Sequence, residues 1–302
     1  MPERPWPILV AGTITRDTVR TPMGFNADGL GGSATYFTLA ARLFAPVHVV
    51  ATVGPDFREK FETAVRHEGV DLRAVIPSDK PTYRWIATHD YRTGTTSSER
   101  SEQGAYERFE PALLPEQRRA PVVFLGSMQP RYQTRVLDQL EAPAVVAGDT
   151  MRLYIREQRR ELESVLPRLD YLILNGIEAM ALAECDSVHE AVARLRDRYE
   201  LRGLLIKEGP RGATLYTGAS TDHVRALPVD PPVDPTGAGD AVAGGFLGYL
   251  AEQRREDRAT LLRAMSYAMV MASFAIQQFS VAGLRSLTRA DVESRMRTLT
   301  PA

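Results

Sequence analysis

The segment from Asp234 to Phe246 has the composition of an anion-binding helix start, with an acid where phosphate chemistry would need a base. Gly237, Ala238 and Gly239 are small enough for successive backbone N–H groups to face one point. The apolar run after them predicts a helix whose positive dipole end faces the same point. An acid beside bound phosphate is unfavourable unless it takes a proton from an attacking nucleophile, so we interpret Asp240 as a general base. The alternative is a Gly-rich helix start at which Asp240 only supplies a favourable charge.

The same segment resembles the C-terminal signature of the ribokinase-like PfkB family of carbohydrate and nucleoside kinases, usually Asp-Thr-x-Gly-Ala-Gly-Asp. The resemblance implies that Asp240 is the catalytic base and that residues 237–239 bind the transferring phosphoryl group. Pro235 replaces the usual Thr, outside the turn, in a loop where some relatives hold a monovalent cation such as K⁺. Asp234 and Thr236 are therefore candidates for a cation loop.

Further matches on the acceptor side follow in the order of the family. Asp17, in the run from Gly12, resembles the family's acid near the end of the first strand, which receives two substrate hydroxyls; a carboxylate can accept such paired hydrogen bonds. The pair Gly31 and Gly32 resembles the glycines that let the backbone approach the sugar. Tyr36 stands where many relatives have an Asn that contacts substrate. We predict that Tyr36 lines the acceptor pocket and narrows its choice.

Matches on the nucleotide side lie in the second half of the chain. Asn175 and Glu178 fit the family's Asn-x-x-Glu, and this spacing places both on one side of a first helical turn. There they would orient waters of a Mg²⁺ ion, which keeps several waters when it binds phosphates. Lys207, Gly209 and Gly212 resemble the Lys-x-Gly-x-x-Gly turn that flanks the nucleotide. The resemblance thus implies ATP and Mg²⁺ as cofactors.

The predicted function is ATP-dependent phosphorylation of a hydroxymethyl group on a small sugar or sugar derivative. A nucleoside kinase of the same fold would need an aromatic-lined base pocket. Five side chains are candidates for that pocket: Phe25, Tyr36, Tyr83, Trp85 and Tyr106. A non-catalytic ATP- or sugar-sensing protein is the third possibility, and the joint presence of the acids and the amide named above argues against it.

The strands and helices that must position these residues are predicted to form an α/β fold. Short apolar runs alternate with longer segments of helical period, the pattern of a mainly parallel sheet covered by helices in a three-layer ribokinase-like sandwich. The predicted strands are 8–11, 47–53, 122–125, 144–147, 171–174 and 204–207, and the predicted helices are 33–44, 57–67, 133–140, 155–166 and 188–199. A hairpin over 213–216 and 223–227 and helices from 238 and over 259–278 follow. Asp149 and Thr150 end one strand at the edge where ligands gather, which makes them supporting candidates.

Two stretches break this rhythm, at about residues 18–30 and 82–108. Residues 82–91 alternate bulky and polar side chains before a Thr93-Gly94-Thr95 turn and a polar segment, as in a hairpin. We predict that both stretches form a small β lid on a single kinase domain spanning 1–302. In relatives of the family that the chain resembles, such lid strands often pair across a dimer, and bare strand edges would otherwise invite nonspecific pairing, so we also predict a homodimer.

Composition excludes several classes of function. The 37 Lys and Arg residues against 38 Asp and Glu give no basic surplus for nucleic-acid phosphates. The single cysteine, Cys185, allows neither an internal disulfide nor a multi-cysteine metal site, and the five histidines lack metal-ligand spacing. No apolar run reaches the ~18 residues of a membrane span, and no signal peptide is recognisable. We therefore expect a cytoplasmic enzyme whose substrate is a small molecule, and we expect that it binds neither a membrane nor a nucleic acid.

Overall fold

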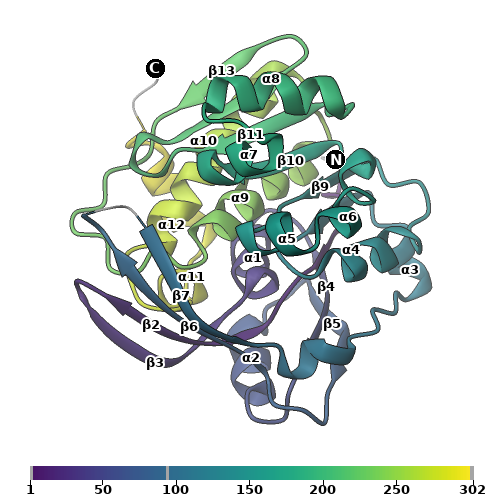
Figure 1. Ribbon diagram of the computed structural model, residues 1–302, viewed down its shortest axis with the longest axis vertical. Coiled ribbons are helices and arrows are strands. Elements are labelled where there is room, and N and C mark those ends of the chain that lie inside the picture. Colours follow the sequence, from purple (N-terminus) through teal and green to yellow (C-terminus); the bar gives the residue numbers. More distant parts are fainter. Residues whose placement is uncertain (1–2, 93–94, 300–302) are drawn as a thin grey trace.

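A sheet of nine strands forms the centre of the molecule, in the order β13-β12-β11-β10-β9-β8-β1-β4-β5 (Figure 1). The computed structural model describes residues 3–92 and 95–299. The strands are β1 Ile8–Ala11, β4 Val47–Val53, β5 Val70–Pro77, β8 Val122–Leu125, β9 Val145–Gly148, β10 Tyr171–Asn175, β11 Gly203–Lys207, β12 Ala213–Thr217 and β13 Thr221–Val224. Neighbours from β11 to β5 pair parallel, and β12 and β13 join antiparallel at one edge.

Helices cover both faces of this sheet. Alternate residues of β1 show the division, because Ile8 and Val10 belong to one buried apolar cluster and Leu9 and Ala11 to the other. One face carries α1 Ser33–Ala41, α2 Arg58–Val65, α9 Ala238–Gln253, α10 Arg258–Ala275, α11 Ala282–Arg285 and α12 Arg289–Met296. The helices on the other side are α3 Pro115–Arg118, α4 Pro130–Leu137, α5 Arg152–Glu157, α6 Arg159–Leu162, α7 Gly176–Ala183 and α8 Val188–Arg198. The arrangement confirms the predicted three-layer α/β fold.

A second sheet, the lid, stands off the body and is seen at the lower left of Figure 1. Its order is β3-β2-β6-β7, with bounds β2 Thr15–Thr21, β3 Gly24–Gly31, β6 Tyr83–Asp90 and β7 Thr95–Glu102. This confirms the predicted lid, although the first strand begins at Thr15 and includes Asp17. The predicted turn at 93–95 falls partly outside the described residues. The homodimer stays a prediction.

Several elements were not predicted correctly, and the helices α3, α11 and α12 were not predicted at all. Strand β5, a half-exposed edge strand, was not predicted, although the alternation of apolar and polar residues over 70–73 is the pattern of a half-buried strand. The predicted helix 155–166 is wrong: Gln158, with φ −130° and ψ 36°, separates α5 from α6. Helix α6 is held by hydrogen bonds of Arg159, whose guanidinium donates to Glu163 at its own C-terminal end and to the Leu182 carbonyl in α7.

In the part of the chain that the structure describes, no helix has the length and apolar character needed to cross a bilayer.

Candidate active site

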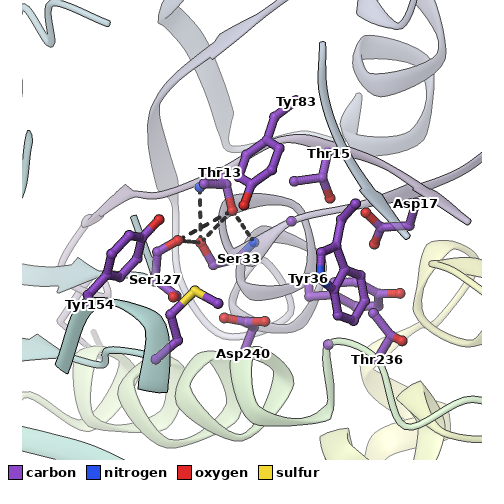
Figure 2. A pocket seen from close by; sticks show the side chains of 14 residues that line it. Thr13, Thr15, Asp17, Ser33, Tyr36, Tyr83, Ser127, Tyr154, Thr236 and Asp240 are labelled. Atoms are coloured by element: carbon purple, nitrogen blue, oxygen red, sulfur yellow. Dashed lines mark hydrogen bonds between the residues drawn. The ribbon is translucent and has the colours of Figure 1, made fainter. Parts of the chain in front are cut away.

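A cavity lies between the carboxyl ends of the central strands and the lid (Figure 2). The order of the sheet reverses here, because the chain continues from β1 outward to β4 and β5, and from β8 outward in the other direction. Open α/β sheets bind ligands at such a reversal. The lining residues are Thr13, Thr15, Asp17, Gly32, Ser33, Tyr36, Tyr83, Trp85, Ser127, Met151, Tyr154, Thr236, Gly237 and Asp240.

Asp17 reaches the cavity from β2, with only 4% of its surface exposed. Burial raises the pKa of this carboxyl to about 7, against a smaller opposing effect of the Thr15 hydroxyl. Gly31 leaves room for it, since a Cβ there would come within 1.8 Å of Asp17 Oδ2. Among the described residues, Asp17 Oδ1 has no hydrogen-bond partner. A buried acceptor without a partner suits the hydroxyls of a bound ligand.

The start of helix α1 is joined to the end of β1 by two reciprocal hydrogen bonds. Thr13 N–H donates to Ser33 Oγ at 3.0 Å, and Ser33 N–H donates to Thr13 Oγ1 at 3.1 Å. Gly32 precedes the helix with φ 97°, and a Cβ there would lie 2.2 Å from the Thr13 carbonyl oxygen. Gly32 is therefore needed for close approach of two backbone segments and Gly31 for the Asp17 side chain, and their contact with a sugar stays a prediction. Thr13 and Ser33 are lining residues that sequence reasoning missed.

Tyr36 lies on the cavity wall, where the sequence had placed it. Its ring packs on the backbone of Gly237, because a Cβ at that glycine would come within 2.2 Å of the ring. Its hydroxyl is buried without a hydrogen-bond partner among the described residues. Tyr36 of helix α1 thus packs against the Gly237 turn, and its effect on acceptor choice stays a prediction.

Helix α9 begins at the floor of the cavity with the predicted anion-binding turn. Gly237 is its N-cap with φ 75°, and Asp240 stands in its first turn with a half-buried side chain. Figure 2 shows the Asp240 carboxylate pointing from this helix into the cavity. Burial raises the pKa of Asp240 to about 6, and Lys207 opposes that rise. The first N–H groups of a helix have no intrahelical partners and carry its positive dipole end, so they suit an anion.

Lys207 stands beside this turn and acts electrostatically on three carboxylates. A Cβ at Gly239 would lie 2.8 Å from Lys207 Nζ. Burial raises the pKa of Asp149 well above its usual range and also raises that of Glu178, and Lys207 opposes both shifts. Together with Asp240, three acids therefore surround one lysine. Burial favours the neutral forms of these acids and Lys207 favours their charged forms, directly beside the start of α9.

Asn175 and Glu178 form a reciprocal cap at the start of α7. Glu178 N–H donates to Asn175 Oδ1 at 2.9 Å, and Asn175 N–H donates to Glu178 Oε2 at 2.8 Å. Among the described residues, no three His, Cys, Asp or Glu side chains converge to bind a metal directly. A role in Mg²⁺ binding through water therefore stays a prediction.

The glycines of the predicted nucleotide turn both have positive φ. Gly209 has φ 60° and open space around its Cα, so the sequence prediction of a turn is consistent with its geometry. Gly212 has φ 113°, and a Cβ there would lie 2.0 Å from the Val224 carbonyl oxygen. Gly212 is thus required for packing, and its contact with nucleotide stays a prediction.

Asp234 shapes the loop that leads into the Gly237 turn. It is 1% exposed, and its two oxygens accept the N–H groups of Thr236 at 2.9 Å and Ser280 at 3.2 Å. Both carboxylate oxygens are therefore already used within the protein. The cation loop predicted at Asp234 and Thr236 stays a prediction.

The lid is tied to this same loop by three hydrogen bonds. Thr21 Oγ1 donates to the Val233 carbonyl at 3.0 Å, and Tyr91 OH donates to the same oxygen at 2.7 Å. His89 Nε2 and Thr236 Oγ1 lie 3.0 Å apart. These lid–loop bonds join strands β2 and β6 to the segment directly before Gly237. No sequence pattern indicated them, because they join residues more than a hundred positions apart.

The predicted aromatic pocket is correct in part. Tyr36, Tyr83 and Trp85 line the cavity. Phe25 is 52% exposed and does not line it, and Tyr106 is a core residue. The Tyr106 hydroxyl donates to the Gly12 carbonyl at 2.7 Å and accepts the Ile14 N–H at 3.0 Å, so it satisfies the backbone beyond β1.

Two apolar lining residues, Met151 and Tyr154, were missed by sequence reasoning. They follow β9, just beyond the Asp149 and Thr150 pair at the predicted ligand edge. Their position directly after a predicted strand could have identified them, because ligands of open α/β sheets bind beyond the carboxyl ends of the strands.

Comparisons with known proteins agree with this geometry. A sequence model described as "pfkB family carbohydrate kinase" matches residues 12–286. A cytidine kinase from Thermococcus kodakarensis is 28% identical over 250 residues, which cover 80% of this chain and 88% of that protein. Arabidopsis thaliana ribokinase complexed with ribose and ATP superposes with a TM-score of 0.77 at 20% identity, covering 98% of this chain and 99% of that one.

A further solved structure shares the fold. A double mutant of fructokinase from Vibrio cholerae O395, with fructose, ADP and potassium ion bound, has a TM-score of 0.75 at 19% identity, covering 97% and 99% of the two chains. At such identities the structural similarity shows a common architecture.

Proposed function

This chain belongs to the pfkB family of carbohydrate kinases, and from that premise we propose that it transfers the γ-phosphoryl group of ATP to a primary hydroxyl of a sugar or of a nucleoside. The observation that carries the proposal is the joint placement of Asp17 and Asp240 in one cavity, with Asp240 in the first turn of α9. One carboxylate can hold the acceptor while the other takes its proton.

The proposed reaction is a direct transfer. Hydroxyls of the acceptor bind the unpartnered oxygen of Asp17, which places the primary alcohol near Asp240. Asp240 accepts the alcohol proton as the alcohol oxygen forms its bond to the γ-phosphorus and the bond from that phosphorus to the β,γ-bridging oxygen of ATP breaks. The N–H groups of residues 237–240 and the dipole of α9 stabilise the charge on the transferring group.

The nucleotide side of the site fits a triphosphate accompanied by a divalent cation. Lys207 would approach the phosphates, leaving Asp149, Glu178 and Asp240 with uncompensated charge. Mg²⁺ bound to ATP supplies positive charge that neutralises phosphate oxygens, and Glu178 with Asn175 would hold its waters. For K⁺, Asp234 would act through the loop it shapes, because both of its oxygens accept backbone N–H groups.

A nucleoside acceptor is the second candidate, favoured by the aromatic side chains that share the cavity with Asp17. A non-catalytic sensor is the third, and it would not need a carboxylate at the helix start that faces the acceptor. A panel of ribose, fructose, adenosine and cytidine, assayed by ADP release, separates the three. We expect acceptor-dependent ADP release with at least one class. Measurable ATP binding with no ADP release for any acceptor would overturn the kinase proposal.

The pH dependence of kcat/KM for the acceptor follows from the two carboxyls. Their pKa values of about 7 for Asp17 and about 6 for Asp240 are both raised, so both groups gain protons as the pH falls through that range. Protonated Asp17 accepts hydrogen bonds less well, and protonated Asp240 cannot act as a base. We expect kcat/KM to fall below pH 7 and more steeply below pH 6. A profile that stays flat from pH 5.5 to 8 would contradict both roles.

A further inference from the structure

The inner face of the lid carries a row of rings on strand β6. Tyr83, Trp85 and His89 are separated by even numbers of residues, so their side chains lie on one face of the strand. Tyr83 and Trp85 line the cavity, and His89 continues the row to the Thr236 contact. The Trp85 and His89 rings meet edge to face, with centroids 6.2 Å apart.

Each ring is held by a hydroxyl of the neighbouring strand β7. Tyr83 OH lies 2.6 Å from Ser101 Oγ, Trp85 Nε1–H donates to Ser98 Oγ at 3.0 Å, and His89 Nδ1 lies 2.8 Å from Thr96 Oγ1. These bonds engage the polar atoms at the ring edges; Tyr83 and His89 are buried, and half-buried Trp85 is the ring of the row that can offer a face to a ligand. The row is therefore an oriented aromatic platform rather than a set of loosely packed side chains.

The platform lies directly beside the carboxylate that would hold the acceptor. In the parallel pairing of β2 and β6, Asp17 is the register partner of Trp85, and Thr15 is the partner of Tyr83. Neighbouring strands lie about 4.8 Å apart, so the polar column on β2 and the aromatic column on β6 are adjacent. A ligand that fills both would carry hydroxyls on one side and a flat apolar group on the other.

The wall formed by residues after β9 is also apolar. Met151 and Tyr154 line the cavity there, and Tyr154 is 1% exposed. A free pentose or hexose carries hydroxyls around its ring and would leave much of this apolar lining without a matching surface. A planar base matches it, because aromatic groups stack face to face or edge to face.

We propose that the acceptor is a nucleoside, with its sugar hydroxyls on Asp17 and its base stacked on Trp85, which Ser98 holds in position. The inference rests on the kinase function proposed above and names the class of acceptor for that same cavity. Trp85 is then the residue that determines specificity, and Ser98 is a positioning residue.

A binding experiment without ATP tests the stacking directly, because the chain has two tryptophans, Trp6 and Trp85. Trp6 does not line the cavity and packs near Arg254, whose guanidinium carbon lies 5.1 Å from the ring centroid. Titration with adenosine or cytidine is expected to quench tryptophan emission in the native chain and in Trp6→Phe. The quench should vanish in Trp85→Phe. A quench that survives in Trp85→Phe and is lost in Trp6→Phe would overturn the proposal.

Kinetics with nucleosides and free sugars give the second test. Base stacking on an aromatic side chain contributes roughly 1–3 kcal/mol, about 5- to 150-fold in affinity, so Trp85→Leu should raise the KM of the preferred nucleoside by about that factor. The KM for ATP should stay within about 3-fold, and Trp85→Phe should restore most of the loss because it keeps a ring. Ser98→Ala should raise the nucleoside KM by a smaller factor and leave kcat nearly unchanged.

The outcomes distinguish this inference from the function on which it rests. If ribose or fructose is phosphorylated with a higher kcat/KM than any nucleoside, the nucleoside proposal is overturned and the kinase proposal stands. An equal loss for sugars and nucleosides in Trp85→Leu also overturns it, since the ring would then not recognise a base. Absence of ADP release with every acceptor would instead remove the kinase proposal itself.

Discussion

Asp240→Asn is expected to lower kcat by about 10² to 10⁴, because general-base catalysis typically contributes that factor. Asn keeps the size of the side chain and its hydrogen-bonding capacity but cannot take the alcohol proton. ATP should still bind, since the backbone of 237–240 is unchanged and loss of a negative charge near phosphates cannot repel them. Single-turnover kinetics with the best acceptor, together with a calorimetric ATP titration, measure the two quantities separately.

Asp149→Asn is the matched control for that experiment. Asp149 belongs to the same group of acids around Lys207 but does not line the cavity, so its substitution alters the electrostatics around Lys207 without removing a base that faces the acceptor. We expect its kcat to fall by less than about 10-fold, the range of a modest electrostatic change. Equal losses in the two variants would mean that the charge of the group, and not proton transfer at Asp240, controls the rate. A near-normal kcat for Asp240→Asn would show that Asp240 is not the general base.

Asp17→Asn is expected to lower kcat/KM for the acceptor by about 10² or more, since hydrogen bonds to a charged group contribute roughly 1.5–3 kcal/mol each and two are proposed here. The loss should fall mainly on the acceptor KM, with the KM for ATP little changed. Steady-state kinetics at pH 8, where Asp17 is ionised, give the clearest difference.

The same substitution should stabilise the protein. The pKa of Asp17 is about 7 in the folded chain against 3.8 as the ordinary value, so between these pH values the unfolded state has already lost a proton that the folded state keeps. Stability therefore decreases as the pH rises through this window, by up to about 4 kcal/mol above pH 7 for a 3-unit shift. Removing the charge should raise the free energy of unfolding at pH 8, and the gain should shrink toward pH 5. Urea unfolding at the two pH values checks this.

Asp28→Asn is a control in the lid for which we expect the opposite change in stability. Asp28 is a half-buried acid on β3 whose pKa is lowered, chiefly by its hydrogen bond from the Arg16 guanidinium, so its charge favours the folded state. Its substitution should reduce stability slightly and leave the acceptor KM unchanged. If Asp17→Asn behaves like Asp28→Asn in both respects, Asp17 is a structural residue of the lid.

The sequence was sufficient for those parts of the site that lie within one short segment. The Gly237 to Asp240 turn could be predicted because residue type and spacing alone indicate a helix start there, with Gly237 as its N-cap. The cap formed by Asn175 and Glu178 could be predicted for the same reason, because both residues lie within one helical turn. The strands with continuous apolar runs were predicted to within about one residue of their observed bounds.

What was missed depends on contacts between distant segments. Ser127 and Tyr154 follow different strands and meet only because those strands are neighbours in the sheet. Tyr106 was assigned to the wrong environment, since an aromatic residue near the lid can face either the cavity or the core, and only packing decides. The break at Gln158 has no helix-breaking residue to announce it and is set by the contacts of Arg159 with α7.

The lid–loop bonds of Thr21, His89 and Tyr91 have a consequence for how this enzyme can be altered, by design or by natural drift. Because the strand that bears Trp85 is hydrogen-bonded to the segment directly before Gly237, a lid substitution that alters acceptor preference is expected to shift the Gly237 to Asp240 turn as well. We therefore expect the choice of acceptor and the rate of phosphoryl transfer to change together in this protein. Variants selected for a new acceptor will need compensating changes near Val233 and Thr236 before they recover a high rate.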